Sequence, residues 1–322
     1  MKKKDLLTVI VPCYNEEAVL PETIKELSQV MINLIESSQI NTQSKLLFVD
    51  DGSKDKTWNL IQEYSKSNNL VTGIKFSRNY GHQNALLAGM TTAVQYSDMI
   101  ITIDADLQDD INAIYEMVAK YYEGIDVIYG VRNNRKTDTV FKRRTALAFY
   151  GLMSKLGVDI IPNSADYRLM SKRATEGLLS FKERNLFLRG MVPLVGYPSA
   201  KVYYARKERF AGESKYPLKK MIKFALDGIT SFSTVPIKLI TNLGLVIVFI
   251  GICLFIYAIV RKIEGQVTVG WTSLMASMWL IGGIQLICLS VIGEYIGKIF
   301  TEVKQRPRFM IEEDIYSDKF KC

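Results

Sequence analysis

Short apolar runs alternate with longer segments of helical character over the first 130 residues of this 322-residue chain. The runs expected to be strands cover residues 6–11, 46–49, 72–76, 99–103 and 127–129. The segments expected to be helices cover residues 24–35, 58–64, 83–94 and 111–122. Because parallel strands need a crossover between them, this alternation predicts an α/β domain with a mostly parallel sheet covered by helices on both faces.

Polar clusters follow three of the expected strands, at the point where each strand ends. They are residues 12–17, Asp50-Asp51-Gly52-Ser53 and Asp104-Ala105-Asp106-Leu107-Gln108. Ligands of such sheets bind beyond the carboxyl ends of the strands. We therefore expect the three clusters to meet in one crevice.

Asp104 and Asp106 are candidate metal ligands. Residues two apart on a strand point to the same side, so both carboxylates can converge where the strand ends, and Gln108 can follow them. Oxygen ligands of this kind suit Mg²⁺ or Mn²⁺, and an ion held in this way can grip a diphosphate. An isolated Asp-x-Asp is also typical of a solvated turn, and residues 50–53 are compatible with a turn and helix cap.

The charge balance restricts the class of partner. The chain has 41 Lys and Arg against 33 Asp and Glu, a formal net charge of +8, which suits an anionic substrate or an anionic membrane surface. The basic residues form no compact nucleic-acid-binding motif, so nucleic acid is not an expected partner. The single histidine, His82, leaves no cluster for zinc and no partners for a serine or cysteine triad. We expect His82 to shape the turn before the helix at 83–94.

Two long apolar stretches near the C-terminus are each long enough to cross a bilayer. Residues 237–260 carry one charge, Lys238, and residues 271–293 carry none. Two such stretches with a short polar loop between them predict a membrane hairpin, although a buried core helix passes the same length test. The larger Lys and Arg clusters precede the first stretch and follow the second, so the positive-inside rule puts the soluble domain and both termini in the cytoplasm.

These patterns divide the chain into a soluble part and a membrane part. The soluble domain is expected over residues 1–210, followed by amphipathic interface helices, in which apolar residues recur at helical spacing, over 211–235. The remaining parts are transmembrane helix 1 (236–260), a short external loop (261–270), transmembrane helix 2 (271–297) and a cytoplasmic tail (298–322).

Five motifs in order carry a resemblance to a known family. They lie at residues 9–17, 49–53, 104–108, 166–169 and 209–216. The chain resembles glycosyltransferase family 2, and more narrowly its polyprenyl-phosphate glycosyltransferases, the group that includes dolichyl-phosphate mannose synthase and the bacterial undecaprenyl-phosphate glucosyl and N-acetylglucosaminyl transferases. With the two apolar stretches, the resemblance covers nearly the whole chain.

The resemblance implies a GT-A fold, with a Rossmann-like and mostly parallel sheet, that uses a nucleotide-sugar donor. By matching position, the base and ribose would be bound by Pro12, Tyr14, Glu16 and Asp50, with Asp51 close by. The donor diphosphate and a Mg²⁺ or Mn²⁺ ion would be held by Asp104, Asp106 and Gln108. Residues near the sugar and the phosphates would be Asp166, Arg168, Arg209, Ser214 and Lys215. In this assignment the catalytic residues are Asp106, Asp166, Arg168, Arg209, Ser214 and Lys215.

The implied reaction is an inverting hexose transfer to undecaprenyl or another polyprenyl phosphate at the cytoplasmic membrane face. A lipid phosphate is already an anion near neutral pH and attacks without a general base, and the sequence leaves open whether Asp166 is a base or orients the sugar. Glucose or N-acetylglucosamine from a UDP donor is favoured by analogy over mannose from GDP-mannose.

Two other classes of protein are weighed against this one. A processive polysaccharide synthase would carry a Gln-x-x-Arg-Trp motif, which is absent because the only tryptophans are Trp58, Trp271 and Trp279. A non-catalytic nucleotide-binding or lipid-translocating membrane protein would not need Asp104, Asp106 and Arg209 together. The sequence leaves open whether the hairpins assemble a homo-oligomer.

Overall fold

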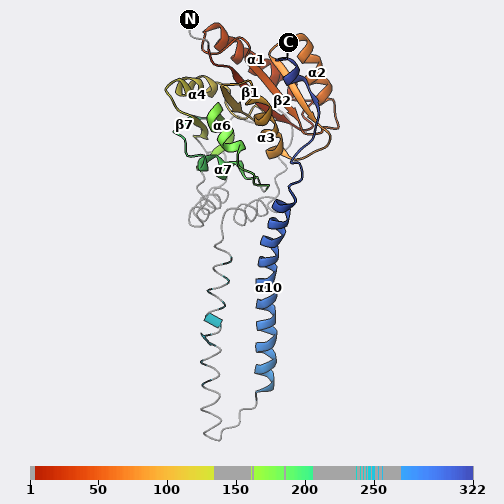
Figure 1. Cartoon of the computed structure of the whole chain (residues 1–322), viewed down its shortest axis with the longest axis vertical. Helices are drawn as coiled ribbons and strands as arrows, with labels where there is room; N and C mark the ends of the chain where they lie inside the picture. The colour runs from red at the N-terminus through yellow and green to blue at the C-terminus, as the bar shows by residue number, and fades with distance from the viewer. Residues whose placement is uncertain are drawn as a thin grey trace. The chain divides into compact units, whose positions relative to one another are not determined.

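The computed structural model of the chain describes residues 4–133, 161, 163–184, 186–205 and 270–321, together with scattered helical residues between 237 and 256 (Figure 1). The chain divides into two compact units, and each is described by itself. The first unit contains the N-terminal part of the chain and the residues from Arg306 onward. The second contains the long helix that ends at Lys304.

An eight-stranded sheet forms the centre of the first unit, in the order β7-β5-β6-β4-β1-β2-β3-β8. The strands are β1 (Leu7–Cys13), β2 (Lys45–Asp50), β3 (Val71–Phe76), β4 (Met99–Thr102), β5 (Val127–Arg132), β6 (Ser164–Ser171), β7 (Ser199–Tyr204) and β8 (Ile311–Asp314). β1 lies between β2 and β4, and the four strands β1 to β4 are parallel. The five strands expected from the sequence are therefore present, and four of them form the expected parallel core.

The sheet becomes mixed beyond β4, so the predicted mostly parallel sheet is confirmed in part. β6 runs antiparallel to both β4 and β5, and β7 pairs with β5 in parallel. The sequence does not predict β6 because this strand buries Asp166 and Arg168 together with its apolar residues. A strand with buried charges shows no apolar run.

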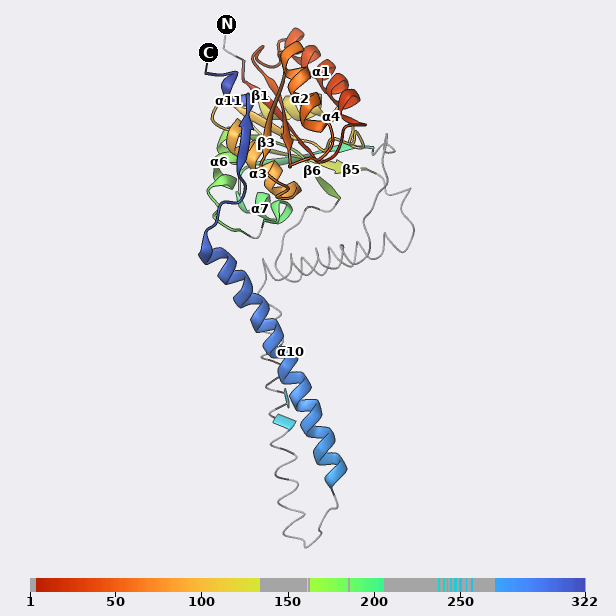
Figure 2. The same ribbon diagram turned by 90° about the vertical axis from the view of Figure 1, so that its right-hand side faces the viewer.

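Helices cover both faces of the sheet, as predicted. They are α1 (Leu20–Glu36), α2 (Thr57–Ser67), α3 (His82–Ala93), α4 (Ala113–Tyr122), α6 (Lys172–Leu179) and α7 (Leu188–Leu194). Leu7, Val9 and Val11 of β1 pack in the core with α1, α2 and α4, whereas Ile10 lies against α3, close to Gly89. This alternation follows from the two-residue period of a strand. Figure 2 shows α1 and α4 on one side of the sheet and α3, α6 and α7 on the other.

Helix α1 illustrates how the sequence sets these elements. Its buried residues include Ile24, Leu27, Met31 and Leu34, which recur every three or four positions and so form one apolar stripe. Pro21 stands in the first turn, where its missing N–H leaves no helical hydrogen bond unmade.

The end of the chain returns to the sheet of the first unit. The sequence predicts only a tail over residues 298–322, whereas β8 pairs antiparallel with β3 and is followed by α11 (Ile315–Asp318). Tyr316 is fully buried, and its hydroxyl lies 2.8 Å from Thr8 Oγ1 and 3.1 Å from Ser97 Oγ. Trp58 Nε1 donates to Glu313 Oε1 at 3.0 Å. In Figure 2 this C-terminal segment, coloured blue, runs beside β3.

The second unit contains α10 (Trp271–Lys304), a helix of 34 residues. Its stretch Ile281–Lys304 is long and apolar enough to cross a membrane, by length and composition, and it is the one such helix among the residues that the structure describes. The expected transmembrane helix 2 (271–297) falls within α10, which continues to Lys304. The interface helices (211–235) lie outside the described residues, as does most of transmembrane helix 1 (236–260), so both stay predictions.

Candidate active site

The loops after β1 and β2 are joined by hydrogen bonds, so the first two polar clusters lie together. Asn15 N donates to Ser53 Oγ at 2.9 Å, and Lys54 N donates to Asn15 Oδ1 at 2.8 Å. Glu16 N donates to Thr57 Oγ1 at 2.9 Å. Asn15 adopts a φ of 54°, in the left-handed region that asparagine tolerates better than most residues. The chain therefore turns sharply out of β1 and runs along the end of β2.

The residues predicted to bind base and ribose lie along this junction. Pro12 is buried within β1, Tyr14 is 42% exposed beyond its end, and Glu16 is partly buried. Asp50 ends β2 and is fully buried, and burial raises the pKa of its carboxyl group. Ser53 N donates to Asp50 Oδ1 at 3.3 Å. Tyr14 is thus the residue of this group that offers a ring to solvent.

Asp51 holds the loop that follows β3. Its Oδ1 accepts a hydrogen bond from Tyr80 N at 2.6 Å, and its Oδ2 accepts one from Gly81 N at 2.9 Å. Asp51 is 3% exposed. Burial raises the pKa of its carboxyl group, and the two backbone N–H groups oppose that rise. The structure gives Asp51 a role in the fold of the site, beside the ligand contact that the resemblance implies.

Gly52 is required for the same junction. Its φ is +66°, and a Cβ built on it would lie 2.4 Å from the carbonyl carbon of Arg78. Any side chain at this position would push the loop after β3 away from β2.

Asp104 and Asp166 lie opposite each other at the paired ends of the neighbouring strands β4 and β6. β4 pairs with β6 in a register that sets Thr102 opposite Arg168, and extending this register by two residues sets Asp104 opposite Asp166. Thr102 Oγ1 also donates to the backbone oxygen of Asp166 at 2.5 Å. The sequence could not show this meeting, because it depends on the antiparallel course of β6.

The Asp104 carboxyl group lies in a strongly negative environment. Burial raises its pKa to about 6, and the nearby charges of Asp166, Asp109 and Asp106 act in the same direction while His82 opposes them. Asp106 Oδ1 accepts a hydrogen bond from Gln108 N at 3.1 Å, and Leu107 between them has a φ of 54°. The Asp104 to Gln108 segment is thus a tight turn at the end of β4, as expected.

The oxygen ligands at this turn fit a divalent cation whose coordination is completed by substrate phosphates. Among the residues that the structure describes, no group of three or more His, Cys, Asp or Glu side chains lies close enough to hold a metal ion. Mg²⁺ typically binds through one or two carboxylates together with substrate phosphates, and it keeps several waters. The two carboxylates Asp104 and Asp106 match that pattern, and a dication would offset the negative charge that raises the pKa of Asp104.

His82 lies within the candidate site. The sequence analysis expected it only to shape a turn. Its Nε2 lies 3.5 Å from Asp104 Oδ1 and 3.8 Å from Asp166 Oδ2. It is the first residue of α3 and follows Gly81, whose backbone N–H is held by Asp51. The only signal in the sequence is a polar turn between a strand and a helix, at the same edge of the sheet as the other clusters.

Asp166 is paired with two arginines. Arg168 Nη2 donates to Asp166 Oδ1 at 2.6 Å, and Arg189 Nη2 donates to Asp166 Oδ2 at 3.0 Å. Burial acts to raise the pKa of Asp166, but the charges of Arg189 and Arg168 outweigh it and hold this pKa well below its usual range. Arg168 is 3% exposed, and its approach to the phosphates, which the resemblance implies, stays a prediction. Arg189, on α7, belongs to none of the sequence motifs.

A second ion pair, between a partly exposed arginine and a buried aspartate, lies where β5 and β7 end. Arg132 Nη2 donates to Asp109 Oδ1 at 3.0 Å, and the Tyr204 hydroxyl donates to the same oxygen at 2.7 Å. These contacts fix the turn at Asp104 from its other end. Arg209, Ser214 and Lys215 lie outside the described residues, so their roles stay predictions.

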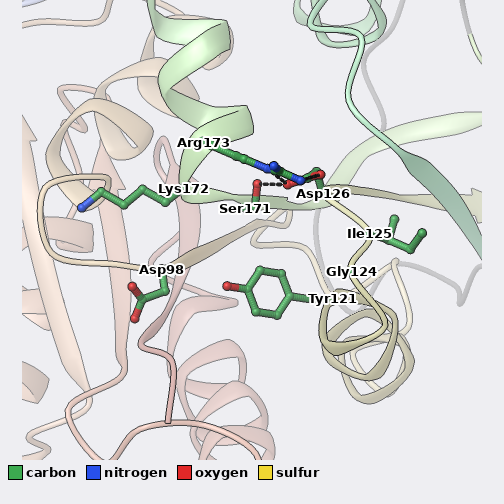
Figure 3. A pocket seen from close by; sticks show the side chains of 8 residues that line it. All are labelled: Asp98, Tyr121, Gly124, Ile125, Asp126, Ser171, Lys172 and Arg173. Carbon is green, nitrogen blue, oxygen red and sulfur yellow. Dashed lines mark hydrogen bonds and ion pairs between the residues drawn. The ribbon is translucent and has the colours of Figure 1, made fainter. Parts of the chain in front are cut away.

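A pocket of about 360 Å³ lies at the opposite edge of the sheet (Figure 3). Asp98 precedes β4, Asp126 precedes β5 and Ser171 ends β6, so this edge carries the amino ends of the parallel strands. Asp126 pairs there with Arg173, with Arg173 Nε 2.6 Å from Asp126 Oδ1. The described residues that line it include none of the residues predicted for donor or metal, so it is not the candidate active site.

Comparison with known proteins identifies the chain. The model described as glycosyl transferase family 2 matches residues 8–179, and the model described as GtrB C-terminal hairpin matches residues 235–299. Together with the mixed α/β sheet and its cluster of carboxylates, these matches define a glycosyltransferase. The chain belongs to glycosyltransferase family 2, and within it to the polyprenyl-phosphate glycosyltransferase group.

Relatives match the chain over almost its whole length. An uncharacterized glycosyltransferase, YkoT, of Bacillus subtilis (strain 168) is 54% identical over 318 residues, which is 99% of this chain and 94% of that protein. The SfII prophage-derived bactoprenol glucosyl transferase of Shigella flexneri is 38% identical over 312 residues, or 95% of this chain and 97% of that protein.

A solved structure aligns with part of the chain. It is glucosyl-3-phosphoglycerate synthase from Mycobacterium tuberculosis, solved with Mn²⁺, UDP and phosphoglyceric acid. It aligns with a TM-score of 0.45 at 17% identity, covering 70% of this chain and 76% of that one.

Proposed function

We propose that the protein transfers a hexose from a nucleotide-sugar to a polyprenyl phosphate at the cytoplasmic face of the membrane, with inversion at the anomeric carbon. UDP-glucose and UDP-N-acetylglucosamine are the favoured donors. The observation that carries the proposal is the end-to-end similarity to proteins named bactoprenol glucosyl transferase, which extends through both the catalytic domain and the C-terminal hairpin.

The nucleoside of the donor is proposed to bind at the junction of β1 and β2. Tyr14 offers an exposed ring there, and Asp50 and Glu16 offer carboxylates to the base and ribose hydroxyls. Pro12 keeps the backbone of the strand end rigid beside them. Asp51 stabilises the neighbouring loop through Tyr80 N and Gly81 N, and so supports the donor site from behind.

The diphosphate is proposed to lie at the turn after β4, where Asp104, Asp106 and Gln108 would hold Mg²⁺ or Mn²⁺. When bound, such an ion would act as a Lewis acid and offset the negative charge that grows on the departing nucleoside diphosphate. The anomeric carbon becomes positively charged at transfer, and the Asp166 carboxylate beside it stabilises that charge and accepts hydrogen bonds from sugar hydroxyls. Arg209, Ser214 and Lys215 are proposed to bind the phosphates of donor and acceptor.

The acceptor needs no general base, because a phosphate monoester is an anion near neutral pH. Asp166 is unsuited to that role, since Arg168 and Arg189 hold its pKa well below the usual range and an efficient base needs a pKa near the operating pH. In-line attack on an α-linked donor then gives a β-linked sugar.

The hairpin is proposed to anchor the enzyme where a polyprenyl chain stays in lipid and presents its phosphate at the surface. Helix α10, at 34 residues, spans about 51 Å, more than the ~30 Å of a hydrocarbon core. Lys298, Lys304, Arg306 and Arg308 at its end favour the cytoplasmic side.

The test uses the purified full-length protein in lipid nanodiscs with undecaprenyl phosphate and labelled UDP-glucose, UDP-N-acetylglucosamine or GDP-mannose. We expect a prenyl-linked β-sugar from a UDP donor in the presence of Mg²⁺ or Mn²⁺, and loss of product on addition of EDTA. No prenyl-linked product from any donor would refute the proposal.

Asp106→Ala is the matching variant. We expect it to abolish transfer and to leave thermal unfolding near the wild-type temperature, because Asp106 is only partly buried and its described hydrogen bond is within its own turn. Near-normal turnover in Asp106→Ala would contradict the metal assignment.

A further inference from the structure

The Asp166 carboxylate is held from two directions. Arg168, on the same strand, contacts Oδ1. Arg189 approaches side-on, with Nη2 at 3.0 Å from Oδ2 and Nε at 3.4 Å from Oδ1. Paired contacts between a guanidinium group and a carboxylate fix orientation as well as charge.

The two arginines differ in burial. The Arg168 side chain is 4% exposed and is part of the core, whereas the Arg189 side chain is 34% exposed. Removal of Arg168 would therefore leave a cavity in the core as well as break its contact with Asp166. Arg189 can be replaced at the surface of the site while Arg168 still pairs with Asp166.

The fold determines where the Arg189 guanidinium lies. Leu188, the residue before it, begins α7, and its N–H donates to Gln83 Oε1 of α3 at 3.3 Å. The Leu188 carbonyl oxygen accepts from Arg168 Nη1 at 3.4 Å. Met191 and Val192 of α7 are buried. Helix α7 is thus anchored to α3 and to β6, the two elements that carry His82 and Asp166.

We propose that Arg189 is a positioning residue, which orients the Asp166 carboxylate toward the donor sugar and keeps it a pure hydrogen-bond acceptor. This inference rests on the proposed function. A carboxylate accepts through about four lone-pair sites, so Asp166 can accept the three contacts from the two arginines and one more from a sugar hydroxyl. If Arg189 is lost, the carboxylate is free to rotate about its remaining contact with Arg168.

Among the residues that the structure describes, the other basic side chain near this carboxylate is His82 of α3. Its Nε2 lies 3.8 Å from Asp166 Oδ2, which is too long for a hydrogen bond. Loss of Arg189 therefore removes the contacts that its Nη2 and Nε make with Asp166, and leaves the one from Arg168 Nη2.

The experiment compares Arg189→Met and Arg189→Lys with a control, Arg173→Met. Arg173 forms the same kind of two-point ion pair, with Asp126 at the opposite edge of the sheet. For each full-length variant, kcat and the KM for the UDP-sugar are measured. We expect Arg189→Met to lower kcat on the order of 100-fold, the effect of a misplaced reacting group, with little change in KM. Arg189→Lys recovers part of kcat, and Arg173→Met keeps the wild-type kcat.

A second measurement does not depend on activity. Thermal unfolding of Arg189→Met, Asp166→Asn and the double variant forms a double-mutant cycle. We expect the shifts in Tm to be non-additive because the two groups contact each other. Additive shifts would overturn the inference, as would an Arg189→Met enzyme with wild-type kcat. If the wild-type protein makes no lipid-linked sugar, the proposed function fails, and the cycle still decides whether Arg189 holds Asp166.

Discussion

Replacement of Asp51 by asparagine separates two roles for this residue. By resemblance, Asp51 lies beside the nucleoside of the donor. In the structure, both of its oxygens accept hydrogen bonds from the backbone N–H groups of Tyr80 and Gly81, the residues just before His82. We expect the structural role to dominate, so that Asp51→Asn acts mainly on stability and on the position of His82.

The magnitude follows from these contacts. A hydrogen bond to a charged group contributes about 1.5–3 kcal/mol. Asparagine keeps one oxygen acceptor and turns an amide N–H₂ group toward the other backbone N–H, so one hydrogen bond is lost and two donors face each other. We expect a loss of about 2–3 kcal/mol in the free energy of unfolding. For a unit of roughly 150–250 residues, this lowers Tm by about 5–10 °C.

The assay is thermal unfolding of the full-length protein in detergent, followed by steady-state kinetics at saturating donor. Asp50→Asn is the matched control, because Asp50 is equally buried but its contact with Ser53 N is long, at 3.3 Å. We expect Asp51→Asn to lower Tm and kcat, and Asp50→Asn to raise the KM for the donor with a smaller change in Tm. An Asp51→Asn protein with an unchanged Tm and a raised KM would refute this reasoning.

Two predictions concern other parts of the first unit. Tyr316→Ala leaves a cavity at a fully buried aromatic site and should lower the free energy of unfolding of this unit by about 3–5 kcal/mol. Tyr316→Phe should lower it by only about 1 kcal/mol, because Thr8 Oγ1 and Ser97 Oγ lie 2.7 Å apart and still bond each other. Equal Tm values for Tyr316→Ala and wild type would show that the C-terminal segment does not support the sheet. Arg173 lowers the pKa of Asp126 in the folded protein, so the pair stabilises the fold above about pH 4, the unfolded pKa of an aspartate, and this stabilisation is lost as the pH falls through the lower folded value. The difference in Tm between wild type and Asp126→Asn should therefore be constant from pH 7 to 5 and shrink below about pH 4, and a difference independent of pH would contradict the ion pair's role.

Much of the candidate site could be predicted because it lies on strands whose signal is local. Asp50 and Asp104 each follow an apolar run, and the runs became β2 and β4. Carboxyl ends of parallel strands share an edge of the sheet, so the meeting of these clusters followed from the pattern. Arg189 and His82 could not be found in this way, since neither lies next to a motif that requires it.

Part of the fold escaped prediction for a related reason. β6 carries buried Asp166 and Arg168, and β8 carries Glu312 and Glu313. Charged residues in a strand are stabilised only by partners elsewhere in the chain, as when Glu313 accepts from Trp58 Nε1. From its local sequence alone, such a strand resembles a solvated loop or tail.

The amino-acid sequence by itself determined the parallel core, the polar clusters at its strand ends, the apolar stretches near the C-terminus and membership of the family, because periodicity and motif order are properties of neighbouring residues. The tertiary structure alone decided that β6 runs antiparallel and so brings Asp166 opposite Asp104, that His82 lies between them, and that Arg189 pairs with Asp166. It also decided that residues 311–314 return to the sheet as β8, beside β3. These features are contacts between residues far apart along the chain, and their energies exist only once the sheet has formed.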